Sequence, residues 1–266
     1  MRMKVILACI SLYCAGLAQA SDFAAARPVP RIEYPQKRLN DITAYLNTAS
    51  DLSRYHLVFI GDSITDFFTM GANPWLRGKI GGKVIWDETF GDGPPENRAL
   101  NLGISGDRTE WLLYRLQAKS AGGLGELDDP RLMPEFIPLM AGINNTYGGE
   151  EPLVDSVYAG IVTLVNEVHA LKPSARIVLG SLLPSNEDWR NQEAVLPVNQ
   201  RLYALAQSSP YRQYVDYIDL YPLYVNAEGH QRPELFMDGL HPNEAGYRLW
   251  RDALLSRIDH ERAVVK

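Results

Sequence analysis

The segment Gly61-Asp62-Ser63-Ile64-Thr65 holds a serine at a position where a hydroxyl can react. It follows the apolar run His56–Ile60, which predicts a strand, and it precedes a segment that is compatible with a helix. A serine at such a turn projects away from the core, and the N–H groups that open a helix can hold a developing oxyanion. Ser63 is therefore a candidate nucleophile, although the same position also suits a residue that only caps the helix.

A serine nucleophile needs a base, and the chain contains five histidines. His241 belongs to the turn-rich segment Asp238-Gly239-Leu240-His241-Pro242-Asn243, in which a carboxylate precedes the imidazole by three residues. One compact turn lets Asp238 accept from one ring nitrogen while the other faces the hydroxyl. The same pattern also fits an ordinary loop in which Asp238 caps a turn and His241 faces water. The histidines that we expect to be structural or solvated are His56, His169 and His260, while His230, beside the turn Asn226-Ala227-Glu228-Gly229, is a weaker alternative as the base.

Acyl transfer also needs donors for the oxyanion, and two loops offer them. Gly103-Ile104-Ser105-Gly106-Asp107 provides a glycine whose N–H can approach a substrate closely, and Gly142-Ile143-Asn144-Asn145 presents amide side chains directly after a predicted strand. Removal of one oxyanion donor typically costs about 3 to 4 kcal/mol of transition-state stabilisation. Each loop taken alone fits a capping turn or an Asx turn equally well.

Other hydrolase chemistries fit the sequence less well. The chain contains no Gly-x-Ser-x-Gly, so the nucleophile elbow of an α/β-hydrolase is not supported. Four potential ligands, Asp62, Asp66, Asp238 and His241, could be imagined around a metal ion, but no pair of histidines has metal-binding spacing. We expect neither a metal nor a cofactor.

Taken in order, these segments resemble the four blocks of the SGNH, or GDSL, hydrolases, a family of esterases and lipases. The blocks are Gly61-Asp62-Ser63, Gly106, Gly142-Ile143-Asn144 and Asp238-Gly239-Leu240-His241. The stretch from Ala99 through Asp107 and Trp111 to Leu116 is similar to the branch of platelet-activating-factor acetylhydrolase catalytic subunits and bacterial acetylesterases. The resemblance runs from about His56 to the final helix.

The resemblance implies a role for each matched position. Ser63 would be the nucleophile, His241 the base and Asp238 its orienting partner, while the N–H groups of Ser63 and Gly106 and the Asn144 side chain would form the oxyanion hole. The third block departs from many members because Asn145 stands where they carry Asp. A second departure is Pro138, which cannot donate a ladder hydrogen bond and leaves open whether the geometry before Asn144 is perturbed.

The elements that position these residues alternate between strands and helices, which predicts a parallel sheet covered on both faces. Ligands of such sheets gather at the carboxyl ends of the strands, where the candidate residues would meet. We therefore expect a single-domain three-layer α/β/α sandwich with a five-stranded parallel sheet, of the flavodoxin-like kind that the resemblance implies. The predicted strands are His56–Ile60, Ala99–Leu102, Glu135–Ala141, Ala175–Gly180 and Tyr214–Leu220, and the predicted helices are Leu153–Leu171, Glu193–Gln207 and Glu244–Ile258.

The N-terminus has the pattern of an export signal. Arg2 and Lys4 precede an apolar core, Val5 to Leu17, which is shorter than the about 20 residues of a membrane-spanning helix. A small-residue cleavage site, Ala18-Gln19-Ala20, follows. We thus predict a signal peptide over residues 1–20, an N-terminal lead over 21–50, extended from Ala26 to Pro35, and a hydrolase domain over 51–262. Localisation would be secreted or periplasmic, with no stable membrane anchor after cleavage.

The amino-acid composition limits which classes of partner and which stabilising bonds we expect. Both cysteines lie inside the predicted signal, so neither disulfides nor thiolate metal sites would remain in the exported chain. The formal net charge is −6 and no cluster of Lys or Arg stands out, which disfavours nucleic acid and anionic membranes as partners. Oligomeric state is not predicted. Aromatic residues that fit a carbohydrate substrate, and also fit packing, are Trp75, Trp86, Trp111, Trp189 and Tyr147.

These observations predict an exported serine esterase that hydrolyses short-chain esters. That the esters are acetylated carbohydrates is implied mainly by the resemblance. The sequence contains no long apolar insertion that would predict a lid over a lipid substrate. This absence favours a short acyl group. Two alternatives stay open at this point: a lysophospholipase or other lipid-directed esterase, and a non-catalytic carbohydrate-binding protein that retains the fold.

Overall fold

The computed structural model describes residues 22–32 and 36–264. The predicted signal peptide, residues 1–20, lies outside these residues. Most of the predicted lead, residues 21–50, is described, and it contains a helix, α1 (Gln36–Thr48), that the sequence analysis did not predict. Between residues 27 and 32 the lead has no regular secondary structure.

The centre of the molecule is a parallel sheet of five strands in the order β4-β1-β5-β6-β7. All four strand pairs are parallel, as predicted, and each strand lies within about two residues of the predicted range. β1 comes first in the chain and lies between β4, the next strand of this sheet, and β5, the strand after that. The chain therefore runs from β1 to the neighbour on one side and then crosses to the neighbour on the other side. The bounds are β1 (Leu57–Gly61), β4 (Ala99–Asn101), β5 (Phe136–Met140), β6 (Arg176–Gly180) and β7 (Val215–Ile218).

Pro138 lies inside β5, between two neighbouring strands. Its pairing with Val178 of β6 is intact. Phe136 N–H donates to His56 O, so Pro138, two residues later, faces β1 and leaves one ladder bond unmade there. The register between β1 and β5 is the same on both sides of the proline, at Leu57 and Phe136 and again at Ile60 and Leu139.

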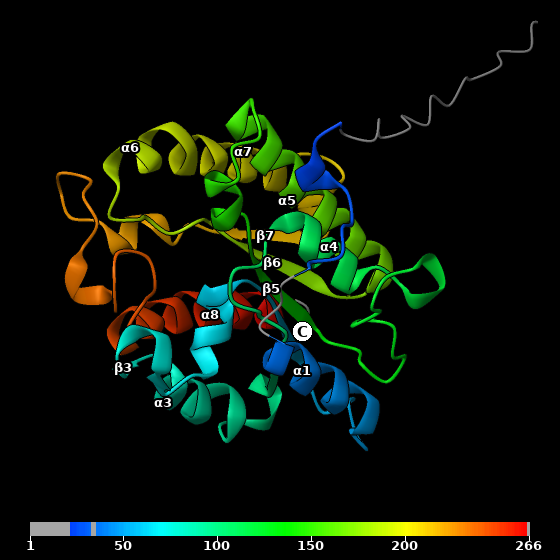
Figure 1. Ribbon diagram of the computed structural model, residues 1–266. Coiled ribbons are helices and arrows are strands. Elements are labelled where there is room, and N and C mark those ends of the chain that lie inside the picture. The colour runs from blue at the N-terminus through cyan, green and yellow to red at the C-terminus, as the bar shows by residue number, and fades with distance from the viewer. Residues whose placement is uncertain (1–21, 33–35, 265–266) are drawn as a thin grey trace, which may run out of the picture.

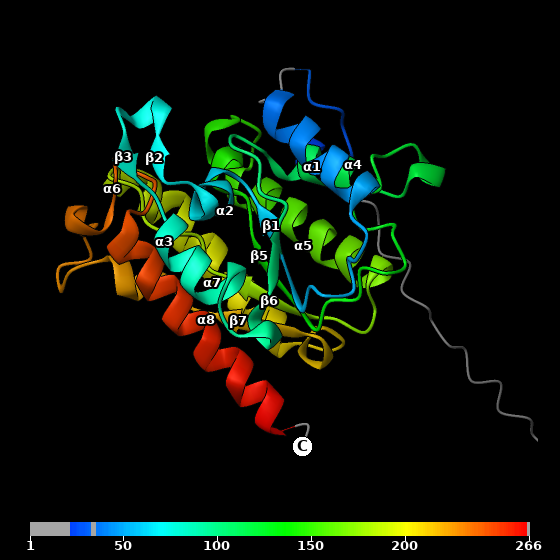
Figure 2. The same cartoon turned by 90° about the horizontal axis from the view of Figure 1, so that it is seen from below.

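Helices cover both faces of the sheet, which confirms the three-layer architecture. Figures 1 and 2 show α4, α5 and α7 on one side of the sheet, with α3 and α8 on the other. The three predicted helices are present as α5 (Leu153–Leu171), α7 (Leu196–Gln207) and α8 (Glu244–Val264). The helical segment that leads into α7 begins earlier, at α6 (Asp188–Arg190). The helix-compatible segment after β1 forms α2 (Ser63–Asp66). Elements that we did not predict besides α1 are α3 (Lys83–Trp86), α4 (Thr109–Leu116), and the hairpin of β2 (Ala72–Asn73) and β3 (Lys79–Ile80).

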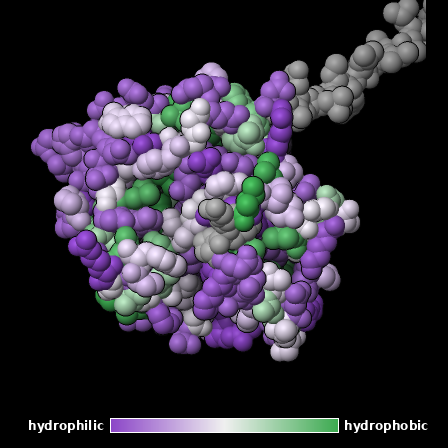
Figure 3. All heavy atoms as spheres, in the orientation of Figure 1, coloured by the Kyte–Doolittle hydropathy of each residue, from purple (hydrophilic) through white to green (hydrophobic). Residues whose placement is uncertain are grey.

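The core is apolar and the surface is mostly hydrophilic. Every residue of β1 and of β5 is buried, as expected for central strands that are covered on both faces. Aromatic rings pack between β1 and α8, with Phe59 in edge contact with Phe68, Trp86 and Trp250. Hydrophilic residues cover most of the face in Figure 3, and hydrophobic ones form small patches. In the described ranges, no helix is long and apolar enough to cross a membrane.

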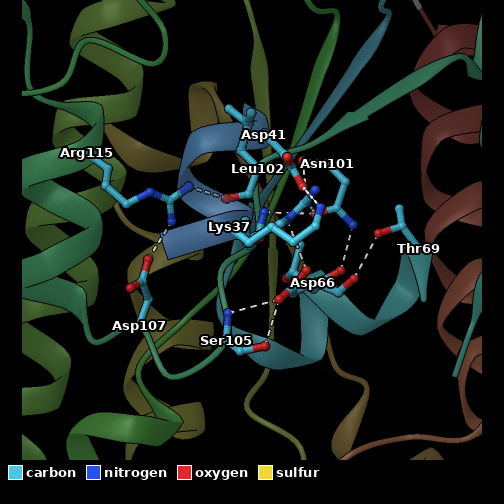
Figure 4. A network of polar contacts seen from close by, with 12 residues as sticks. Lys37, Asp41, Asp66, Thr69, Asn101, Leu102, Ser105, Asp107 and Arg115 are labelled. Carbon is cyan, nitrogen blue, oxygen red and sulfur yellow. Dashed lines mark hydrogen bonds and ion pairs between the residues drawn. The ribbon is translucent and has the colours of Figure 1, made fainter. Parts of the chain in front are cut away.

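A buried ion network links α4 to the loop that follows β4 (Figure 4). The guanidinium of Arg115 is fully buried and contacts both carboxylate oxygens of Glu126, at 3.0 and 2.8 Å. It also donates to Asp107 and to the backbone oxygen of Leu102. Burial lowers the pKa of Arg115, but the two carboxylates outweigh burial and hold the pKa above its usual value. Each of the three nitrogens of the guanidinium therefore donates to at least one acceptor inside the core.

Replacement of Arg115 by Met should lower the free energy of unfolding by about 3 to 5 kcal/mol, because the buried carboxylate of Glu126 would lose this guanidinium and that of Asp107 would keep its contact with Arg31 but lose the one with Arg115. Urea denaturation measures the effect. The control is Arg201→Met, which removes an exposed ion pair with Asp155 and should cost less than about 1 kcal/mol. Equal losses in the two variants would contradict the predicted importance of the buried network.

Candidate active site

Ser63 opens the short helix α2 directly after β1. Asp62 caps this helix, because its Oδ1 accepts from Ile64 N–H at 2.9 Å. Gly61 is required at the end of the strand, since a Cβ there would lie 2.4 Å from the backbone oxygen of Met140. The chain can therefore turn from β1 into α2 while β5 passes close beside it. The side chain of Ser63 is left at the carboxyl edge of the sheet.

The structure brings His241 and Asp238 to Ser63. His241 Nε2 lies 2.9 Å from Ser63 Oγ, and His241 Nδ1 lies 2.9 Å from Asp238 Oδ2. An ionised carboxylate only accepts hydrogen bonds, so Nδ1 carries the proton and Nε2 is left to accept from the serine hydroxyl. Asp238 Oδ1 also accepts from the N–H groups of Leu240 and His241, which fixes the carboxylate within the turn.

Neighbouring elements hold these side chains in place. The ring of Phe67 packs on the imidazole of His241 with centroids 4.8 Å apart. Met237 N–H donates to His241 O at 2.7 Å, and Asn186 N–H donates to Gly239 O at 2.8 Å. On the serine side, the buried hydroxyl of Tyr247 in α8 donates to Ile64 O at 2.7 Å. Both halves of the Ser–His contact are thus anchored to the core.

The two glycine- and asparagine-containing loops are tied to the serine turn. Ile104 N–H donates to Gly61 O at 3.3 Å, and both the N–H and the hydroxyl of Ser105 donate to Asp66 Oδ2 in α2. Asn144 Nδ2 donates to Asp107 O at 2.8 Å, which joins the loop after β5 to the loop after β4. The loops that carry Ser63, Gly106 and Asn144 therefore form one hydrogen-bonded unit.

Donor groups remain available in this unit. Among the described residues, the N–H groups of Ser63 and Gly106 donate to no protein acceptor. The amide of Asn144 uses one hydrogen toward Asp107 O and retains a second. These are the three donors that the sequence resemblance assigns to an oxyanion hole, and they are held by three connected loops.

The pKa values of two carboxyl groups near Ser63 are shifted in opposite directions by their surroundings. Partial burial raises the pKa of Asp238, but hydrogen bonds from the ring and the N–H of His241 outweigh it and hold the pKa at about 2. Complete burial raises the pKa of Asp62 to about 7, against the lowering effects of the Ile64 N–H and of His241. Asp62 Oδ2 has no hydrogen-bond partner among the described residues. Asp238 is thus ionised at neutral pH, whereas Asp62 is poised to change its charge there.

The other histidines are not brought to Ser63. His56 Nδ1 contacts Glu135 Oε1 at 2.9 Å where β1 and β5 begin, at the opposite edge of the sheet. His230 Nδ1 contacts Asp188 Oδ2 at 2.9 Å at an exposed site. In the part of the chain that the structure describes, no group of three or more His, Cys, Asp or Glu side chains is arranged to hold a metal ion.

Several residues that shape the site were missed in the sequence. Arg38 of α1 contacts Asp66 Oδ1 at 3.0 Å and donates to Asn101 O, and Arg31 of the lead donates to Ser105 O (Figure 4 shows part of this network). Asn101 in turn donates to Thr65 O. The only signal available was the charge of Arg38 and Asp66 in otherwise ordinary segments, and nothing in their spacing reveals that they meet.

Comparison with known proteins gives a family match over most of the chain. Residues 59–249 match the GDSL-like lipase/acylhydrolase family. The chain is 29% identical over 192 residues to the platelet-activating factor acetylhydrolase IB subunit alpha1 of Rattus norvegicus, covering 72% of this chain and 69% of the relative. The alpha2 subunit of the same organism is 31% identical over 194 residues, covering 72% and 70%.

Solved structures share the fold. A GDSL-like lipase from Bacteroides thetaiotaomicron superposes with a TM-score of 0.60 at 19% identity, over 85% of this chain and 97% of that one. A carbohydrate esterase family 3 protein from Talaromyces cellulolyticus gives 0.51 at 17% identity, over 80% and 100%. With the family match over most of its length, this chain belongs to the GDSL-like lipase/acylhydrolase family and is a carboxylic ester hydrolase.

Proposed function

We propose that the protein is an exported serine esterase that removes short acyl groups, acetyl above all, from the esterified hydroxyl groups of carbohydrates. The observation that carries the catalytic part is the chain of two 2.9 Å contacts from Asp238 through His241 to Ser63. Export is supported by the signal-like pattern of residues 1–20.

In the proposed reaction, Ser63 Oγ attacks the ester carbonyl while its proton passes to His241 Nε2. Asp238 stabilises the imidazolium, and the N–H groups of Ser63 and Gly106 with the Asn144 amide hold the oxyanion. The tetrahedral intermediate collapses when the alcohol oxygen leaves with the proton from Nε2. Water then attacks the acyl-enzyme, gives a proton to Nε2, and the carboxylic acid leaves as that proton returns to Ser63.

The choice of carbohydrate rests on exposed aromatic rings on both sides of His241. Trp75 is 64% exposed and stacks on Phe67, whose other contact is the imidazole of His241. Tyr147 follows the Asn144 turn, and the guanidinium of Arg190 lies 3.5 Å from its ring and 4.5 Å from that of Trp189. Rings that are exposed and held by packing offer flat faces to sugar rings at little entropic cost.

A hollow of about 500 Å³ lies beside the β2–β3 hairpin and is lined by Met237, the residue before Asp238, but by none of the three catalytic side chains. Its lining combines apolar side chains such as Phe236 with the charged groups of Lys79, Glu244 and Arg248. Charged walls suit a hydroxylated alcohol better than a hydrocarbon chain, because an apolar chain would have to displace water from them. The names of solved structures that share the fold, a carbohydrate esterase and an acetyl xylan esterase, agree with this proposal.

Substitution of Ser63 or His241 by Ala should reduce kcat for p-nitrophenyl acetate by about 10⁴-fold or more, because either change removes the attacking alkoxide or its base. Covalent labelling by a fluorophosphonate should disappear in Ser63→Ala. His56→Ala is the control, since His56 has a carboxylate partner at the same distance but no serine. An inert and unlabelled wild type would favour a binding protein, and turnover in either site variant would refute the mechanism.

Replacement of Trp75 or Trp189 by Ala should raise KM for acetylated xylo-oligosaccharides about tenfold, which corresponds to about 1.4 kcal/mol of lost contact. Activity on p-nitrophenyl acetate should stay close to that of the wild type. Tyr203→Ala, which removes an exposed ring on α7, is the control. Faster hydrolysis of long-chain or phospholipid esters than of acetylated sugars would instead favour a lipid-directed esterase.

The raised pKa of Asp62 predicts a pH dependence of stability. Between pH 4 and about 7 the folded protein holds a proton that the unfolded chain has lost, so the free energy of unfolding falls as pH rises through this range. Asp62→Asn should abolish that fall: it should match the wild type at pH 4 and be more stable at pH 8. Urea denaturation at the two pH values tests this, and a constant difference between the proteins would contradict it.

A further inference from the structure

Arg31, in the lead that precedes α1, reaches the loop that contains Gly106. Its Nη1 donates to Ser105 O at 2.8 Å and to Asp107 Oδ1 at 2.9 Å. The side chain is 15% exposed, and its guanidinium also lies over the ring of Trp111 at 4.8 Å. A charged side chain from outside the predicted hydrolase domain is therefore packed onto the proposed oxyanion loop.

The atom that Arg31 contacts determines where the Gly106 N–H points. Ser105 C=O and Gly106 N–H belong to one peptide group, which is planar and trans, so the two bonds point in opposite directions. Because Arg31 binds the oxygen, the N–H is directed away from the guanidinium. Gly106 has φ +81°, and a glycine can rotate between backbone conformations at little cost. Hydrogen bonds from Asp107 N–H to Ile104 O and from Ser105 to Asp66 hold the ends of this turn, and the contact of Arg31 with the Ser105 oxygen acts on the peptide itself.

We propose that Arg31 is a positioning residue of the oxyanion hole: it fixes the Ser105–Gly106 peptide and polarises it. A hydrogen bond from a charged donor to a carbonyl draws electron density from the whole peptide group, so the N–H at its other end becomes a stronger donor. The inference rests on the proposed function, since it assigns Gly106 N–H to the developing oxyanion.

The packing around Gly106 agrees with this role. A Cβ on Gly106 would lie 2.8 Å from Arg31 Nη2, so the guanidinium sits directly on the glycine. The carboxylate of Asp107 accepts from Arg31, and its backbone oxygen accepts from the Asn144 amide. Arg31 consequently acts on one donor through Ser105 O and is linked to another through Asp107.

The experiment compares the full-length protein with the variants Arg31→Ala and Arg31→Lys. Initial rates on p-nitrophenyl acetate give kcat and KM, thermal denaturation gives Tm, and fluorophosphonate labelling rates report on a tetrahedral adduct. Arg27→Ala is the control, because Arg27 lies in the same lead but is 58% exposed and donates to Asp22 O. The Arg31→Ala assay is repeated with millimolar guanidinium chloride.

In Arg31→Ala we expect kcat and the labelling rate to fall together by about 10- to 100-fold, less than the loss of a direct oxyanion donor. KM should change by less than about twofold, because ground-state binding is untouched. Guanidinium should restore part of the kcat of Arg31→Ala. The kcat of Arg31→Lys should lie between those of Arg31→Ala and the wild type, since Lys keeps the charge without the planar fork.

Wild-type kcat in Arg31→Ala, with an active wild type, would overturn this inference and leave the proposed function intact. A lower kcat that guanidinium does not restore, accompanied by a matching loss of Tm, would also overturn it in favour of a structural role. A wild type that neither turns over nor reacts with the fluorophosphonate would overturn the proposed function, and this inference with it.

Discussion

The hydrogen bond between Ser63 Oγ and His241 Nε2 joins residues that are 178 positions apart, and the rest of the site depends on it. The order of the sheet makes the meeting possible, because β1 and β5 lie in the middle and their carboxyl ends open toward the same edge. α8 then closes the arrangement: it begins just after His241, and its Tyr247 binds the turn that carries Ser63. One helix thus fixes both partners of the bond.

Burial and hydrogen bonding give the acidic groups around this bond different charges. Asp238 receives three hydrogen bonds from its own turn and stays ionised, so it can stabilise a positive imidazole. Asp62, the residue before Ser63, is fully buried, and its Oδ2 has no hydrogen-bond partner among the described residues. When Asp62 is protonated, it adds no negative charge to a site in which an oxyanion has to form. Asp62 therefore caps α2 and changes the charge of the site as it titrates near pH 7.

How much of the fold and of the site can be predicted from the sequence depends on how far apart along the chain the interacting residues lie. Apolar runs predict the strands because central parallel strands are buried on both faces, and the blocks around Ser63 and His241 are compact enough to recognise. α1 was missed because a mostly polar helix that packs against an edge strand buries only one residue, Ile42, completely. Contacts such as Arg38 with Asp66 depend on tertiary placement alone, so spacing along the chain carries no trace of them.

Asp107 explains why such distant contacts matter. Its carboxylate accepts from Arg115 in the core and from Arg31 in the lead, and its backbone oxygen accepts from Asn144. Two guanidinium groups thus contact one buried carboxylate, one from α4 through Oδ2 and one from the lead through Oδ1. A loop built on a flexible glycine can hold its N–H at a fixed angle only if such contacts restrain it. The geometry of the site therefore includes the lead as well as the sheet.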